Sequence, residues 1–147
     1  MEQRLDYKSV SPEGYKAFGG VHHYIAQSLD ESLKNLVYLR VSQINGCAYC
    51  VDLHTRDALK NGENPRRLHN VITWREAPFF TPRERAALAW AESLTLLPET
   101  GAPDADYAEV RKHFDDKELA DLTYAIALMN AFNRLGVGFR MSPPLEP

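Results

Sequence analysis

Hydrophobic residues recur along most of the chain at steps of three and four, the period that gathers them on one face of a helix. After Asp30, the residues at these steps are Leu33, Leu36, Val37, Val41 and Ile44. Short β-branched runs that alternate with polar residues, the pattern of a strand, are nearly absent. The pattern therefore predicts an all-α fold.

Capping signals divide this pattern into separate helices. Ser11 and Pro12 predict a helix that runs to about Gln27, because serine caps a helix well and proline suits its first position. The segment 81–84, Thr-Pro-Arg-Glu, combines a capping box with a proline start. The pair Asn45-Gly46 predicts a helix end, since both residues tolerate the left-handed conformation that a C-cap needs.

Taken together, these signals predict a compact bundle of about six or seven helices. Further capping boxes are expected at Ser28–Glu31 and at Asp115–Glu118, and Asn61-Gly62 is a second helix end. The helices expected are 11–27, 31–45, 47–61, a short one after Pro65 with Leu68, Val71, Ile72 and Trp74 as its apolar members, one from Pro82 towards Pro98, a brief one near 104–112, and a long one that begins at Asp115–Glu118.

Length, composition and charge narrow the class of protein. The chain has 147 residues, which suits a single domain over 1–147, and its net charge of -3 argues against nucleic acid or an anionic membrane as a partner. The first residues, MEQRLDYKSVSPEGY, are too polar for a signal peptide, and no apolar run has the length of a membrane span. We therefore expect a cytoplasmic protein, in which a cysteine pair is more often reactive or metal-binding than structural.

The stretch NGCAYCVDLHT holds both cysteines, Cys47 and Cys50, followed by His54. Residues three and four apart share a face of a helix, so the three side chains are expected to lie together. A thiolate can attack a peroxide, a second thiol can condense with the resulting sulfenic acid, and an imidazole can accept a proton. The helix N-terminus favours Cys47 as the attacking thiol and the proximity of the base favours Cys50, so the residues alone leave that choice open.

Two other interpretations of the motif remain. The two thiols and His54 could bind zinc with His22 or His23 as a fourth ligand, although a second CxxC or H-x3-H pair is missing. Alternatively, the cysteines are inert and simply pack. Tyr49, between them, is expected to be a packing aromatic whose hydroxyl could reach the site.

Three segments resemble the carboxymuconolactone decarboxylase superfamily, and within it the alkylhydroperoxidase AhpD-like branch. They are LVYLRVSQINGCAYCVDLHTRDA, TWREAPFFTPRERAALAWAESLT and HFDDKELADLTYAIALMNAFNRLGV, and the similarity extends over roughly Tyr15–Arg140. The resemblance implies a compact helical fold that assembles as a homo-oligomer, a trimer or a hexamer, with no cofactor or metal. It also implies reduction of peroxides, or recycling of a peroxiredoxin, through the CxxC pair.

Residue by residue, the resemblance makes Cys50 the peroxidatic cysteine, Cys47 its resolving partner and His54 a member of the family's proton relay. Asn35 stands where the relay commonly has a glutamate, and an amide neither accepts a proton nor supplies a negative charge. Glu31, one turn earlier, could supply that charge through a water. Tyr49 stands where the best-known redox member has an additional histidine.

The motif and the resemblance leave three functions open. The first is a thiol-dependent peroxidase that acts on a small hydroperoxide and is reduced by a thiol or dithiol. The second is a decarboxylase of the carboxymuconolactone type in aromatic catabolism, a reaction that does not need a CxxC pair. The third is a non-catalytic oligomer in which the pair senses redox state or binds zinc.

Other polar residues receive structural interpretations. Asn130, Asn133 and Arg134 are expected to support an interface or the packing of a helix end. Glu84 and Glu92 are expected on the solvated face of their helix.

Overall fold

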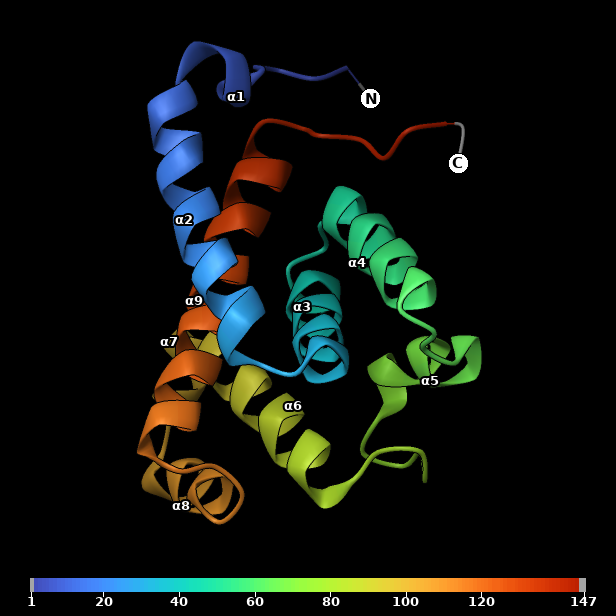
Figure 1. The fold of residues 1–147 in the computed structure, drawn as a ribbon, viewed down its shortest axis with the longest axis vertical. Helices are drawn as coiled ribbons and strands as arrows, with labels where there is room; N and C mark the ends of the chain where they lie inside the picture. The colour runs from blue at the N-terminus through green and yellow to red at the C-terminus, as the bar shows by residue number, and fades with distance from the viewer. Residues whose placement is uncertain (1, 146–147) are drawn as a thin grey trace.

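The computed structural model describes residues 2–145, which form nine α-helices and one short 3-10 helix and contain no strand (Figure 1). The all-α prediction is confirmed. The elements are α1 (Tyr7–Val10), α2 (Pro12–Ser28), α3 (Glu31–Ile44), α4 (Ala48–Lys60), α5 (Pro65–His69), η1 (Val71–Thr73), α6 (Pro82–Thr95), α7 (Leu97–Thr100), α8 (Asp104–Arg111) and α9 (Asp116–Gly138).

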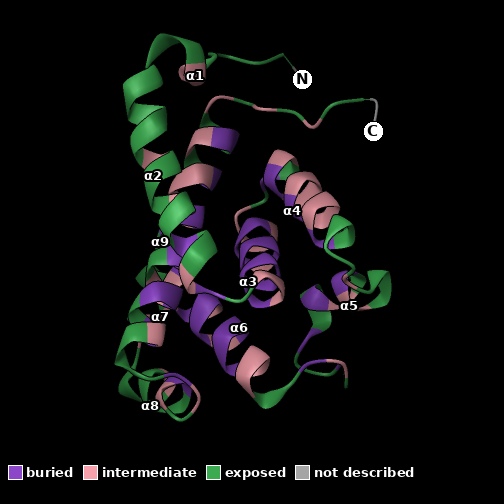
Figure 2. Ribbon diagram, in the orientation of Figure 1, coloured by how far each residue is buried: buried purple, intermediate pink, exposed green. Residues whose placement is uncertain are grey.

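Helix α3 forms the centre of the fold. It packs against α4, α6 and α9, and its residues from Leu33 to Leu39 are all buried. Helix α2 lies on the outside against α9 and buries only Ile25 among its residues. Figure 2 shows this contrast between a buried α3 and an exposed α2. The α3–α4 connection, which carries the CxxC motif, therefore starts from the most constrained part of the molecule.

Six of the seven predicted helices form as single helices, with two additions and one wrong capping box. The helix predicted after Pro65 is divided into α5 and η1. The four-residue helices α1 and α7 were not predicted, because helices this short carry too few residues for a periodic pattern. The capping boxes at Thr81 and Asp115 are present. The box expected at Ser28 is wrong: Ser28 closes α2 and donates to the Tyr24 carbonyl, while the Asp30 carboxylate accepts from the Leu33 N–H and caps α3.

Three further residues differ from expectation. Ile72 is 61% exposed, whereas Val71 and Trp74 are buried. In a 3-10 helix residues three apart eclipse each other, so Val71 and Trp74 face the core and Ile72 turns away from it. Glu84 and Glu92 are not on a solvated face, because Glu84 pairs with Arg67 and Glu92 pairs with Arg40 and Arg75, with side-chain exposures of 14% and 15%.

The turn between α3 and α4 is held by hydrogen bonds to α9. Gly46 adopts a left-handed φ of 67°, as the predicted helix end requires. The Asn45 side-chain amide donates at 3.0 Å to the oxygens of Asn130 and Asn133, and Asn133 donates at 3.0 Å to the Ser42 hydroxyl. The buried polar groups of this turn are thus paired across two helices.

Within residues 2–145, no helix is both long and apolar enough to cross a membrane.

Candidate functional site

The two cysteines lie at the start of α4 and both are buried. Cys47 is the N-cap residue, and the Cys50 backbone N–H donates to its sulfur at 3.4 Å. The two Sγ atoms are 2.7 Å apart, within hydrogen-bond distance, and both thiols are free. The predicted pairing of the thiols on one helix face is therefore present.

Helix α9 approaches this pair through a glycine. A Cβ atom at Gly136 would lie 2.8 Å from the Cys47 sulfur and 3.7 Å from the Cys50 sulfur. Real Cβ atoms do not approach another atom that closely, so a larger residue here would displace a thiol. Gly136 therefore permits the contact between α9 and the CxxC turn.

The surroundings of the two sulfurs make Cys47 the more acidic thiol of the pair. A hydrogen bond from the Cys50 thiol, backbone N–H groups of Cys50 and Tyr49, and the Asn133 side chain together lower the pKa of Cys47 against the opposing effect of burial. The hydrogen bond to Cys47 and burial raise the pKa of Cys50. The hydrogen bond with Cys50 is the largest contribution to the lowered pKa of Cys47, and the backbone N–H groups at the helix start act in the same direction because they favour an anion.

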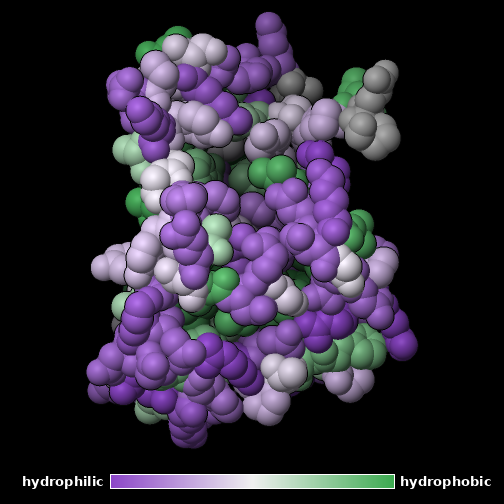
Figure 3. Space-filling view, in the orientation of Figure 1, coloured by the Kyte–Doolittle hydropathy of each residue, from purple (hydrophilic) through white to green (hydrophobic). Residues whose placement is uncertain are grey.

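Cys50, and not Cys47, lines a cavity of about 180 Å³, here called the thiol cavity. His54 and Tyr49 also line it, so three residues of the predicted site border the same space, and His22 joins them. Most of the remaining wall is aromatic or apolar: Tyr7, Tyr15, Leu53, Met129, Phe132 and Met141. Figure 3 shows a recess between α2 and α4 on an otherwise largely hydrophilic face.

His54 is buried between the thiol cavity and a second cavity. Its ring lies 4.9 Å from the ring of Tyr38, centroid to centroid, and the Tyr38 hydroxyl lies 3.5 Å from Nδ1 of His22. Burial, followed by the positive charges of His22 and Lys34, lowers the pKa of His54 to about 4. The imidazole is therefore neutral at neutral pH, with one nitrogen that donates and one that accepts.

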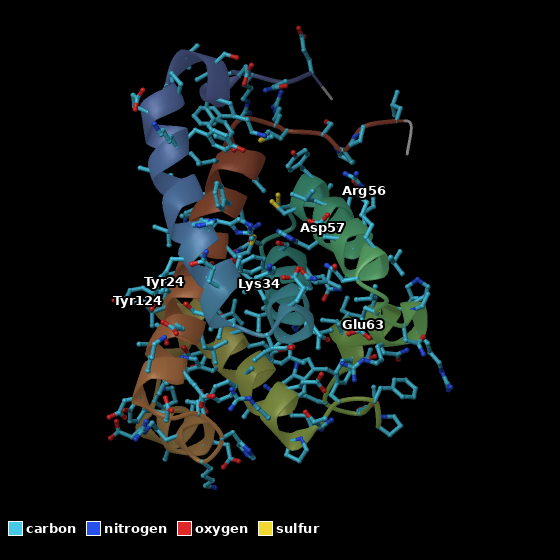
Figure 4. All side chains as sticks on the ribbon, viewed as in Figure 1. Tyr24, Lys34, Arg56, Asp57, Glu63 and Tyr124 are labelled. Carbon is cyan, nitrogen blue, oxygen red and sulfur yellow. The ribbon has the colours of Figure 1, made fainter. Side chains whose placement is uncertain are left out.

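The second cavity, of about 320 Å³, is polar and is here called the polar cavity. Lys34 of α3 and Asp57 of α4 border it and are labelled in Figure 4. Both His22 and His54 line it as well as the thiol cavity. The other residues around it are Glu31, Asn35, Tyr38, Lys60 and Asn61.

Asn35 and Glu31 lie in the polar cavity and are bonded to each other. Asn35 is 3% exposed and donates to Glu31 at 3.2 Å. The Glu31 carboxylate also pairs with Lys34 at 2.6 Å and accepts from Asn61 at 3.1 Å. The carboxylate that the sequence suggested as a substitute is thus on the same cavity as His54, with its charge compensated by Lys34.

The sequence did not single out several residues that shape this site. Gly136 carries no chemistry of its own, and only its contact with Cys47 reveals its role. Lys8 and Tyr7 belong to a helix too short to predict. Of the adjacent histidines His22 and His23, only His22 lines the thiol cavity, and His23 is exposed. Among residues 2–145, no group of three or more potential ligands could hold a metal ion.

Comparisons with known proteins identify the family of the chain. The sequence model of the Carboxymuconolactone decarboxylase family matches residues 12–93 of the chain. The chain belongs to this family. A curated family relative, the uncharacterized protein YdfG of Bacillus subtilis, is 40% identical over 138 residues, which cover 93% of this chain and 94% of YdfG. The uncharacterized protein YnjA of Escherichia coli is 34% identical over 69% of this chain, and the match spans 56% of YnjA.

Solved structures extend the likeness to the whole fold. The protein ATU0492 of Agrobacterium tumefaciens, described as a putative antioxidant defence protein AhpD, is 39% identical and covers 99% of this chain and 100% of its own, with a TM-score of 0.95. A peroxidase-related protein of Ralstonia eutropha with an AhpD core is 24% identical, with a TM-score of 0.83 over 95% of this chain and 75% of its own. The AhpD-like bundle predicted from the sequence is thereby confirmed.

The contact at Gly136 predicts a steric effect on the thiols. Gly136→Ala should lower the free energy of unfolding by about 1–3 kcal/mol, the usual cost of overpacking, and change the rate at which the thiols react with a disulfide reagent. Gly138→Ala is the matched control, because nothing lies within 4 Å of a Cβ there. Urea unfolding and thiol titration measure both effects; equal behaviour of the two variants would refute the contact.

The burial of His54 predicts a dependence of stability on pH. The unfolded chain binds a proton at His54 near pH 6.5 and the folded chain only near 4, so the free energy of unfolding should fall as the pH falls through that interval. The pKa of His22 is lowered by burial too, which adds a change of the same sign. NMR titration should give a midpoint near 4 for His54, and a midpoint near 6.5 would contradict its burial.

Replacement of single histidines tests whether His54 causes this pH dependence of stability. In denaturation experiments between pH 4 and 6.5, His54→Gln should lose much of the slope of stability against pH. His69→Gln, which changes an exposed residue outside both cavities, should retain it.

Proposed function

We propose that the protein is a thiol-dependent peroxidase that reduces small organic hydroperoxides through Cys47 and Cys50. The observation that carries the proposal is the different surroundings of the two thiols: the Cys47 sulfur accepts from the Cys50 backbone N–H as the cap of α4, and the Cys50 side chain lines a cavity. A peroxide that enters this cavity meets Cys50 first. The likeness to ATU0492, described as a putative antioxidant defence protein, supports the same class of reaction.

The first step transfers a proton within the pair. Cys47 is the more acidic thiol of the pair and its sulfur lies 2.7 Å from that of Cys50, so its thiolate is the nearest acceptor for the Cys50 proton. The Cys50 thiolate then attacks the terminal peroxide oxygen and the O–O bond breaks. Cys50 becomes a sulfenic acid, and the alkoxide that leaves takes the proton held by Cys47, which yields the alcohol.

The second step closes the disulfide. The Cys47 thiolate attacks the sulfenic sulfur of Cys50, the S–S bond forms, and hydroxide leaves and is protonated to water. An external thiol or dithiol then reduces the disulfide by exchange and returns both cysteines to their starting form. The sum is one hydroperoxide and two thiol groups converted to alcohol, water and a disulfide.

His54 serves this cycle as a neutral imidazole. It borders the thiol cavity beside Cys50 and the polar cavity beside Glu31 and Asn35. A neutral imidazole donates from one nitrogen and accepts at the other, so it can pass the proton that the leaving hydroxide needs from the polar cavity to the sulfurs. This role requires no full negative charge at position 35.

Replacement of each cysteine tests the order of the thiols. Cys50→Ser should abolish consumption of cumene hydroperoxide, since it removes the thiol that faces the cavity. Cys47→Ser should still form a sulfenic acid at Cys50, more slowly because the proton acceptor is lost, but no intramolecular disulfide. Peroxide assays with dithiothreitol, together with a sulfenic acid probe, measure both outcomes; unchanged turnover in Cys50→Ser would rule out the proposal.

Asn35→Glu tests the missing relay acid. A carboxylate near His54 stabilises the imidazolium, so the His54 pKa should rise from about 4 and the peroxide-dependent rate should increase. Asn35→Gln has nearly the same shape without the charge and is the control. If both variants have equal rates, or if Asn35→Glu is slower at equal stability, the site does not use a charged relay.

A further inference from the structure

The charge around the thiol cavity is unbalanced. Lys8 lines the cavity, and among its described lining residues no aspartate or glutamate is present. His54 is held neutral by burial. In a chain with a net charge of -3, this cavity therefore presents a positive charge to whatever enters it.

Lys8 is held in place by aromatic rings and not by a carboxylate. Its ammonium lies 5.1 Å from the ring centroid of Tyr15 and 5.5 Å from that of Tyr49. Tyr7, the preceding residue, stacks on Phe139 with a centroid distance of 5.6 Å, which ties α1 to the end of α9. Within residues 2–145, Lys8 forms no salt bridge. The nearby Asp6 carboxylate lies outside the cavity wall and accepts from Ser9, and this hydrogen bond, with a smaller contribution from the charge of Lys8, lowers the pKa of Asp6.

The rest of the wall is suited to an apolar body. Leu53, Phe132, Met129 and Met141 border the same space as Cys50. A volume of about 180 Å³ suits a small organic molecule and is below the range typical of drug-sized ligands. An apolar wall with one ammonium at its edge matches a molecule with an apolar body and one anionic group.

We propose that the thiol cavity binds small amphipathic anions, aromatic or branched organic acids, with the carboxylate at Lys8 and the apolar body against the aromatic wall. The proposal deepens the peroxidase function and rests on it in one respect: the substrate is then the hydroperoxide of such an acid, with its peroxide group directed to Cys50. Lys8 is the residue that determines the charge preference.

The competing explanation is that Lys8 acts only on the thiols, by stabilising a thiolate. That effect would change the reactivity of Cys50 towards charged and neutral reagents alike. A binding role would change it towards anions alone, so a matched pair of reagents separates the two.

Iodoacetate and iodoacetamide form such a pair, since they deliver nearly the same group to a thiol and differ in charge. Lys8→Met should lower the ratio of the iodoacetate rate to the iodoacetamide rate by about fivefold, the effect of one charge near contact distance. Lys16→Met, an exposed lysine of α2 outside the cavity, is the control and should leave the ratio unchanged. An equal loss for both reagents, or no change in the ratio, would overturn the proposal.

Protection by a reversible ligand gives an independent measurement. Benzoate should protect Cys50 of the full-length protein from iodoacetamide at a lower concentration than benzamide, its neutral analogue, and Lys8→Met should remove the difference. Equal protection by the two, or none by either, would overturn the proposal. A far-UV spectrum and unfolding midpoint equal to those of the unmodified protein establish that Lys8→Met folds.

The two proposals fail in different ways. If cumene hydroperoxide is consumed but neither reagent pair shows a charge preference, the peroxidase function stands and the anion site is refuted. If both pairs show the preference but no hydroperoxide is consumed, the cavity binds anions and the peroxidase function is refuted.

Discussion

The amide hydrogen bonds of Asn45 and Asn133 fix the turn from which both thiols project. Asn133 is 1% exposed; its oxygen accepts from Asn45 and its nitrogen donates to Ser42, while the Cys47 N–H donates to the Ser42 carbonyl at 3.0 Å. A buried amide with partners on both its atoms tolerates little displacement, because any lost bond leaves an unpaired polar group. The relative position of α3, α4 and α9 at the site therefore depends on this network.

The same hydrogen bonds hold the turn where α9 approaches the two sulfurs. With the turn held, Gly136 brings the helix backbone against the sulfurs and leaves one face of Cys50 open to the thiol cavity. Cys47 is turned instead towards the backbone N–H groups at the start of α4. The two chemically identical residues thus acquire different protonation and different access from their surroundings alone.

Two cavities meet at His54, and they differ in character. The thiol cavity is aromatic and carries a single ammonium, whereas the polar cavity contains the compensated pair Glu31 and Lys34. An imidazole between them is buried enough to stay neutral and is still in contact with both spaces. The arrangement separates an aromatic space that borders Cys50 from a polar space that borders Glu31 and Lys34.

The sequence by itself determined the helical fold, because apolar periodicity, capping boxes and the Gly46 helix end depend on neighbours within a few residues. It also predicted that Cys50 and His54 share one face of α4, which follows from their spacing of four residues on a helix, and both line the thiol cavity. It misplaced the cap of α3, and it assigned Glu84 and Glu92 to solvent because their arginine partners come from other helices.

Only the tertiary structure decided which thiol faces the cavity, how Gly136 approaches the two sulfurs, and that Lys8 and His22 reach the site from the N-terminal helices. Those features depend on contacts between residues that are far apart in the chain, and no local pattern records such contacts.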